Sequence, residues 1–80
     1  MSLFLRVQPV VASTLKIEPG SLGPTSTSED FPAQWDSMGQ VNLIMALEEE
    51  FNVFIEPEDF NALKSVAAIE AYLRKAGVQG

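Results

Sequence analysis

Residues 35–51 read Trp35-Asp36-Ser37-Met38-Gly39-Gln40-Val41-Asn42-Leu43-Ile44-Met45-Ala46-Leu47-Glu48-Glu49-Glu50-Phe51. Apolar residues recur in this stretch at spacings of one, three and four residues, namely Leu43, Ile44, Leu47 and Phe51. Such spacing is typical of the core-facing side of an amphipathic helix. Asp36 is a suitable N-cap, because its carboxylate can accept the unpaired N–H groups of a first helical turn. The stretch therefore predicts a helix from Ser37 to about Phe51 that packs on a core.

The start of this helix is a favourable place for a negative charge. Ser37 directly follows the cap, so we expect it at the first helical position. Backbone N–H groups lack acceptors there and the helix dipole is positive, so an anion attached to the serine would be stabilised. This setting suits a phosphodiester and does not indicate catalysis.

A second apolar stripe runs along the same stretch and is rotated from the first. It consists of Met38, Val41 and Met45. A surface helix needs one apolar stripe for its core, and methionine suits surfaces that meet several partners. Glu48 and Glu49 would add charge pairing to a basic partner. The stripe is a candidate partner-binding face; the alternative is that its residues, Val41 above all, cover the core.

The triplet Asp36-Ser37-Met38, followed by Leu43-Ile44-Met45-Ala46-Leu47-Glu48-Glu49-Glu50-Phe51, resembles the acyl carrier protein family. In that family the serine of an Asp-Ser-Leu-type motif carries 4′-phosphopantetheine. The resemblance implies that Ser37 is the attachment point, that Asp36 belongs to the motif, and that the chain is a carrier and not an enzyme. The cofactor would come from coenzyme A. Its thiol would hold acyl or aminoacyl groups as thioesters between enzymes of fatty-acid, polyketide or other specialised biosynthesis.

The resemblance also implies the partners. A phosphopantetheinyl transferase would modify Ser37. Acyl-loading and acyl-processing enzymes with basic or apolar docking surfaces would contact the partner-binding residues Met38, Val41, Met45, Glu48 and Glu49. Fatty-acid synthase carriers usually have acids just after the serine motif, where this chain has Gly39 and Asn42. Because these two positions are neutral while the neighbouring stripe is apolar, we expect partner contacts that depend more on apolar burial than on charge. The Trp35 that precedes the Asp-Ser pair resembles that of stand-alone carriers of specialised pathways.

Residues before this stretch predict one helix and a long loop. Proline is well accommodated in the first turn of a helix and disrupts its interior. Because of Pro9, we expect the first helix to begin near Val7 or Gln8 and to end near Lys16, with residues 1–6 irregular. Residues 18–35 are rich in Gly, Pro, Ser and Thr and predict a loop. The apolar residues that would attach this loop to the helices are Leu22, Phe31 and Trp35.

Residues after the stretch predict a short helical turn and a last helix. Pro57 would begin the turn, and Ser65 would cap a helix from Val66 to Lys75 that Gly77 stops. The residues expected to fill the core beside Phe51 are Phe54, Ile55, Phe60 and Leu63. Residues 76–80 would form a tail. The sequence thus predicts one all-α domain over residues 1–80, a small carrier-like bundle of three main helices plus one short helix, with a long first loop.

Charge and composition restrict the function further. The chain of 80 residues has a net charge of −6, and no lysine or arginine lies between Glu18 and Leu63. Such an acidic middle repels nucleic acids and anionic membranes and attracts basic protein surfaces, although solubility alone would also explain it. The chain has no histidine, so a Ser-His-acid triad is impossible. It has no cysteine, so disulfides and thiolate metal sites are excluded.

Other kinds of site are not expected. No apolar run approaches the roughly 18 residues of a membrane span, and Arg6, Gln8 and Pro9 interrupt the apolar residues at the start of the sequence. A secretory signal is therefore not expected. Lys16 and Lys64 lie outside the acidic middle, so we expect no lysine beside Ser37. The chain shows no calcium-binding loop and no Gly-rich phosphate loop, and we expect a monomeric, cytoplasmic protein without a metal.

Two other classes of function stay open at this stage. One is a helical interaction module with an unmodified Ser37, which would bind a single protein through the same Met and Glu face. The other is a DNA-binding helical bundle, which the acidic middle disfavours.

Overall fold

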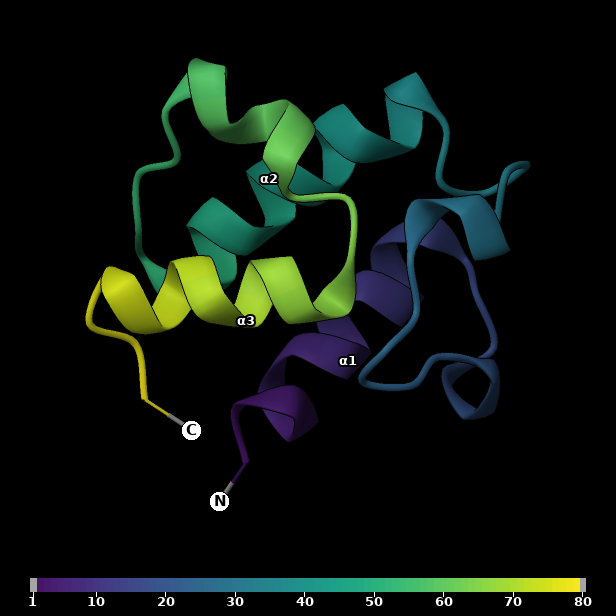
Figure 1. The fold of residues 1–80 in the computed structure, drawn as a ribbon, viewed down its shortest axis with the longest axis horizontal. Helices are drawn as coiled ribbons and strands as arrows, with labels where there is room; N and C mark the ends of the chain where they lie inside the picture. Colours follow the sequence, from purple (N-terminus) through teal and green to yellow (C-terminus); the bar gives the residue numbers. More distant parts are fainter. Residues whose placement is uncertain (1, 80) are drawn as a thin grey trace.

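The computed structural model describes residues 2–79. Within them lie three α-helices, α1 (Leu3–Leu15), α2 (Ser37–Phe51) and α3 (Val66–Lys75), and three short 3-10 helices, η1 (Pro19–Ser21), η2 (Ser28–Asp30) and η3 (Pro57–Ala62). The α-helices surround one core, and η3 lies beside α2 (Figure 1). The described part of the chain contains no strand. The predicted all-α bundle, with one short helix before the last, is confirmed.

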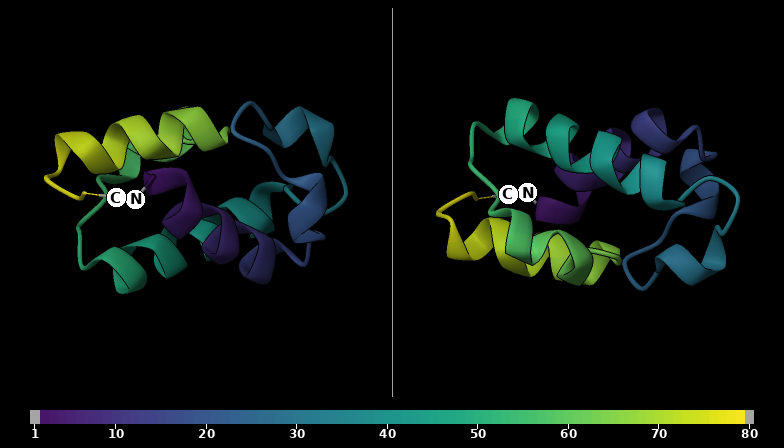
Figure 2. Two further views of the ribbon diagram at one scale, coloured as in Figure 1. Left: turned by 90° about the horizontal axis from the view of Figure 1, so that it is seen from below. Right: turned by 90° about the horizontal axis from the view of Figure 1, so that it is seen from above.

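The core takes side chains from all three α-helices and from the segments between them. Views from below and from above show α1 between α2 and α3, against which it packs (Figure 2). The buried apolar residues are Leu3, Val7, Val11, Ala12, Leu15, Ile17, Leu22, Trp35, Leu43, Ile44, Leu47, Phe51, Ile55, Leu63, Val66, Ile69 and Leu73. The core stripe expected on α2 is therefore fully used. No helix within residues 2–79 has the length and apolarity that a membrane crossing requires.

The start of α1 differs from the prediction. The helix begins at Leu3 and not near Val7 or Gln8, so residues 3–6, expected to be irregular, are helical; Met1 lies outside the described residues. Ser2 caps this end, because its Oγ accepts the N–H of Phe4 at 3.2 Å.

Pro9 is tolerated inside α1 because the defect faces outward. Without an N–H, Pro9 leaves the carbonyl of Leu5 without its helical donor. Both residues are exposed, with Leu5 at 55%, so water can reach the carbonyl. On the opposite side, Leu3 and Val7 are buried at 3% and 0% exposure. Burial of these two residues favours the extra helical turn before the proline.

The long loop between α1 and α2 is attached to the bundle at several points. The Gln8 side-chain amide donates to the carbonyls of Pro19 and Leu22 at 2.7 and 2.8 Å. Leu22 and Trp35 are buried and Phe31 is partly buried, as predicted. The loop expected over residues 18–35 also contains η1 and η2.

A second set of backbone bonds joins the loop to the segment before α3. The N–H of Ser28 donates to the carbonyl of Lys64 at 2.8 Å, and the N–H of Val66 donates to that of Ser26 at 3.0 Å. These bonds hold the end of the long loop beside the residues that follow η3.

Phe54 does not fill the core, contrary to the prediction. Its side chain is 70% exposed, whereas Ile55 and Leu63 are buried and Phe60 is partly buried. The chain is not helical after Asn52, and side chains of an extended segment alternate in direction. The carboxylate of Glu48 accepts the N–H of Ile55 at 2.9 Å. With Ile55 directed into the core, Phe54 is directed outward.

The boundaries of α3 follow the prediction. The Oγ of Ser65 accepts the N–H of Ala68 at 3.1 Å, and Gly77 has a φ of +95°. The N–H groups of Gly77 and Val78 donate to the carbonyls of Arg74 and Leu73 at 3.0 and 2.8 Å. This is the Schellman arrangement that a glycine after a helix favours.

A buried hydrogen-bond network fixes the start of α2. The indole Nε1–H of Trp35 donates to Oε1 of Gln40 at 2.6 Å. The Nε2 of Gln40 donates to the carbonyls of Phe60 and Leu63 at 2.6 and 3.0 Å. Gln40 is only 6% exposed, so this network connects the loop, the first turn of α2 and η3 in the interior.

Gly39 also fixes the start of α2, by close packing. A Cβ at this position would lie 2.5 Å from the carbonyl oxygen of Gln34 and 3.0 Å from Cδ2 of Leu15. Gly39 is buried and therefore does not contribute to the neutral partner face expected from the sequence. Of the two neutral residues, only Asn42 is exposed.

Gly39→Ala is predicted to destabilise the fold. Alanine is the better helix former by about 1 kcal/mol, but the overlap with a backbone oxygen should cost about 1–3 kcal/mol and exceed that gain. Urea unfolding measures the difference. Gly20→Ala is the control, because nothing lies within 4 Å of a Cβ at Gly20. Equal stabilities of the two variants would contradict the close packing at Gly39.

Gln40→Met is predicted to destabilise the fold more strongly than Gln34→Met. Methionine keeps the length of the side chain but leaves the Trp35 indole N–H and the Leu63 carbonyl without partners, at about 1–3 kcal/mol for each buried group. Gln34 is exposed and its side chain makes no hydrogen bond within residues 2–79, so it serves as the matched control. Thermal unfolding followed by Trp35 fluorescence measures both. A Gln40→Met protein as stable as the control would show that the network contributes nothing.

Candidate functional site

The N-terminal end of α2 is open to solvent and holds unpaired donors. Oδ1 of Asp36 accepts the N–H of Gly39 at 2.7 Å, so the predicted N-cap is confirmed. Ser37 is the first helical residue and is exposed. Among the bonds formed within residues 2–79, none uses the N–H of Ser37 or of Met38. Two donors and a positive dipole end therefore surround an accessible hydroxyl.

A pocket of about 360 Å³ opens beside Ser37. It lies between the first turn of α2, η3 and the end of the long loop. Its lining residues are Ser28, Trp35, Asp36, Ser37, Gln40, Val41, Phe60, Asn61 and Lys64. The exposed hydroxyl, the two unpaired N–H groups and a lysine fit a phosphodiester linked through the serine.

The sequence analysis did not identify two residues of this site, Gln40 and Lys64. Gln40 occupies the core side of α2, three residues before Leu43 and four before Ile44; a polar residue at a core position was the available signal. Lys64 was not expected near Ser37, yet both line the pocket. The two are far apart in the sequence, and only tertiary bonds such as that from Ser28 to Lys64 bring them together.

The second apolar stripe of α2 lies on the surface. Met38, Val41 and Met45 are 73%, 46% and 61% exposed, so these residues do not cover the core. Glu49 is exposed and follows Met45 by one helical turn, which places it on the same face. Glu48 is partly buried and bonds to the N–H of Ile55, so its carboxylate is already engaged within the chain.

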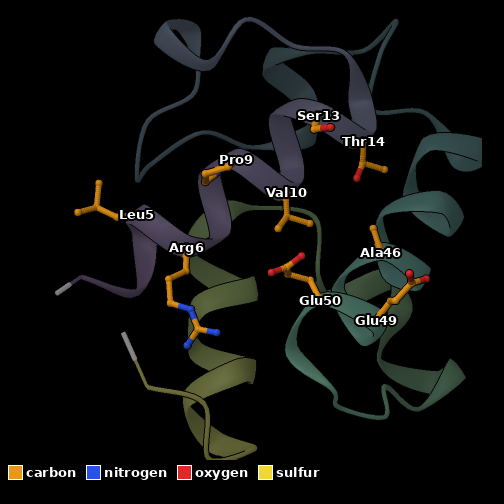
Figure 3. A pocket seen from close by; sticks show the side chains of 9 residues that line it. All are labelled: Leu5, Arg6, Pro9, Val10, Ser13, Thr14, Ala46, Glu49 and Glu50. Atoms are coloured by element: carbon orange, nitrogen blue, oxygen red, sulfur yellow. The ribbon is translucent and has the colours of Figure 1, made fainter.

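A larger groove of about 510 Å³ lies between α1 and α2, away from Ser37. Val10 and Glu50 point toward one another across it (Figure 3). The guanidinium of Arg6 lies 5.0 Å from the ring centroid of Phe51 and donates to the carbonyl of Gln79. Glu49 also lines this groove, so the groove borders the exposed methionine stripe.

Comparison with known proteins identifies the family. The family described as "Phosphopantetheine attachment site" matches residues 6–73. An acyl carrier protein of Bdellovibrio bacteriovorus is 35% identical over 78 residues, which cover 96% of this chain and 97% of the relative. One of Thermosynechococcus vestitus is 45% identical over 62 residues, covering 76% and 74%. One of Campylobacter curvus is 37% identical over 78 residues, covering 96% and 99%.

The family match over residues 6–73 spans nearly all of the helical bundle, including the exposed serine end of α2. Carriers of this kind are modified by a phosphopantetheinyl transferase and exchange their cargo with acyl-processing enzymes. The chain therefore belongs to the acyl carrier protein family, and it carries covalently attached 4′-phosphopantetheine rather than acting as a catalyst.

Proposed function

We propose that Ser37 is the residue that carries 4′-phosphopantetheine. The observation that carries this proposal is the exposed hydroxyl at the first position of α2, next to two N–H groups that lack acceptors within residues 2–79. These groups and the helix dipole would stabilise the charge of the phosphodiester. The Asp36-Ser37 motif identified in the sequence supports the same residue.

The chain itself positions and presents the arm. When bound, the prosthetic group supplies the thiol that holds acyl or aminoacyl groups as thioesters. Asp36 keeps the first turn of α2 formed through its bond to Gly39, and the Trp35–Gln40 network fixes that turn against η3. The serine is thereby held at the surface, within reach of a transferase.

Ser37→Ala is predicted to abolish the modification and to leave the fold intact, because Asp36 still caps α2. The natural protein, this variant and Ser13→Ala are each incubated with coenzyme A and a broad-specificity phosphopantetheinyl transferase. Intact mass spectrometry then detects the adduct. Ser13 is also exposed but lies on α1, so Ser13→Ala should be modified as completely as the natural protein. An adduct on Ser37→Ala, or none on the natural protein, would refute the assignment.

We further propose that partner enzymes dock on the face of α2 formed by Met38, Val41, Met45 and Glu49, with Glu48 at its edge. Three exposed apolar side chains beside a carboxylate suit a partner surface that combines apolar and basic groups. Asn42 is a neutral residue on the exposed side of α2. A neutral residue there supports an interface that depends more on apolar burial than on charge, and it supports a carrier of a specialised pathway. The carrier acts as a cytoplasmic monomer, and its acidic charge disfavours nucleic acid.

Met45→Ala is predicted to weaken transfer from the cognate acyl-loading enzyme more than Glu49→Gln does. Burying a methionine contributes about 1.5–3 kcal/mol, whereas an exposed charge pair contributes about 0.2–1 kcal/mol. Steady-state kcat/KM with the loading enzyme measures both effects. Leu5→Ala is the control, since Leu5 is similarly exposed but lies on α1. A larger loss for Glu49→Gln would contradict a mainly apolar interface.

A further inference from the structure

We propose that Lys64 binds the phosphodiester of the prosthetic arm and holds the arm in the pocket beside Ser37. This inference rests on the attachment at Ser37 proposed above. It gives a role to a residue outside the attachment motif, and it assigns the pocket beside Ser37 to the arm.

The first argument is the position of Lys64. It lines the same pocket as Ser37, which has a volume of about 360 Å³. Its backbone is held there, because its carbonyl accepts the N–H of Ser28 at 2.8 Å and the adjacent Ser65 pairs with Thr27. Its side chain therefore extends from a backbone that is held at the edge of the pocket.

The second argument is charge. Lys64 is the only lysine or arginine among the residues that line this pocket. No carboxylate within residues 2–79 lies in salt-bridge distance of it, and the ion pair of the described residues joins Arg74 to Glu70. The carboxylate of Asp36, which also lines the pocket, is bonded to the N–H of Gly39. The ammonium group is thus available to a ligand, and lysine is a common phosphate binder in proteins.

The third argument is the chemistry of the pocket walls. The side-chain polar groups of Trp35 and Gln40 already form hydrogen bonds within the internal network. These two residues are therefore not expected to form hydrogen bonds with the arm. Ser28 and Asn61 make no side-chain hydrogen bond within residues 2–79 and can pair with the amide groups of pantetheine. Val41 and Phe60 provide apolar wall for its methyl and methylene groups. The polar edge and the apolar walls of the pocket therefore match the amide groups and the hydrocarbon groups that alternate along the arm.

The test is a thermodynamic cycle between the modification and Lys64. Urea unfolding is measured for the unmodified and the phosphopantetheine-bearing forms of the natural protein, Lys64→Gln and Lys75→Gln. The modification adds negative charge to a chain that already carries −6. Lys75 is the matched control, an exposed lysine in the last turn of α3 that does not line this pocket.

The modification should couple more strongly to Lys64 than to Lys75. The effect of the modification on the unfolding equilibrium constant should change by about 1.4- to 5-fold in Lys64→Gln, the range for an exposed ion pair, and less in Lys75→Gln. Lys64→Arg should restore the natural value. The phosphorus NMR signal of the arm should move in Lys64→Gln and stay in place in Lys75→Gln.

Two results would overturn the proposal. Equal changes in Lys64→Gln and Lys75→Gln would show that only long-range charge is involved, and no change in either would show that the arm does not contact Lys64. Failure of the transferase to add mass to the natural protein is separate, because it refutes the attachment at Ser37 before any unfolding is measured. The unmodified Lys64→Gln protein should unfold cooperatively with the urea m-value of the natural protein, which confirms that the substitution leaves the fold intact.

Discussion

The buried chain of hydrogen bonds from the Trp35 indole through the Gln40 amide to the carbonyls of Phe60 and Leu63 is the constraint on which the site depends. It joins three segments that local rules leave independent: the end of the long loop, the first turn of α2 and η3. A half-satisfied buried network is costly, so these segments are held in one arrangement. Ser37 stays at the surface because Trp35, two residues earlier, is anchored in the core.

The two sides of α2 differ in burial, and this difference suits a carrier. The side with Leu43, Ile44 and Leu47 is completely buried and makes the helix a rigid support. The opposite side leaves Met38 and Met45 largely exposed, so their burial is available to stabilise a complex. A carrier must release each partner after transfer, and the docking proposed for this small apolar stripe would provide modest affinity that a succession of enzymes can share.

Sequence reasoning predicted those features that local rules determine. Asp36 and Ser65 cap α2 and α3 as expected, because capping depends on a few neighbouring residues. The predicted start of α1 was wrong, because the burial of Leu3 in the bundle outweighs the hydrogen bond lost at Pro9. Lys64 and Gln40 reach the site through tertiary contacts, and no periodicity in a single sequence reports such contacts. The position of Ser37 at the start of α2 was predictable, because its cap Asp36 and its helix are adjacent in the chain.

Amide NMR of the unmodified and modified forms tests most directly whether the first turn of α2 is a preformed anion site. The N–H signals of Ser37 and Met38 should show the largest downfield shifts on modification, because they gain a charged acceptor. The Trp35 indole N–H signal should stay in place, since its bond to Gln40 already exists. Unchanged Ser37 and Met38 signals, or a displaced Trp35 indole signal, would contradict a preformed site.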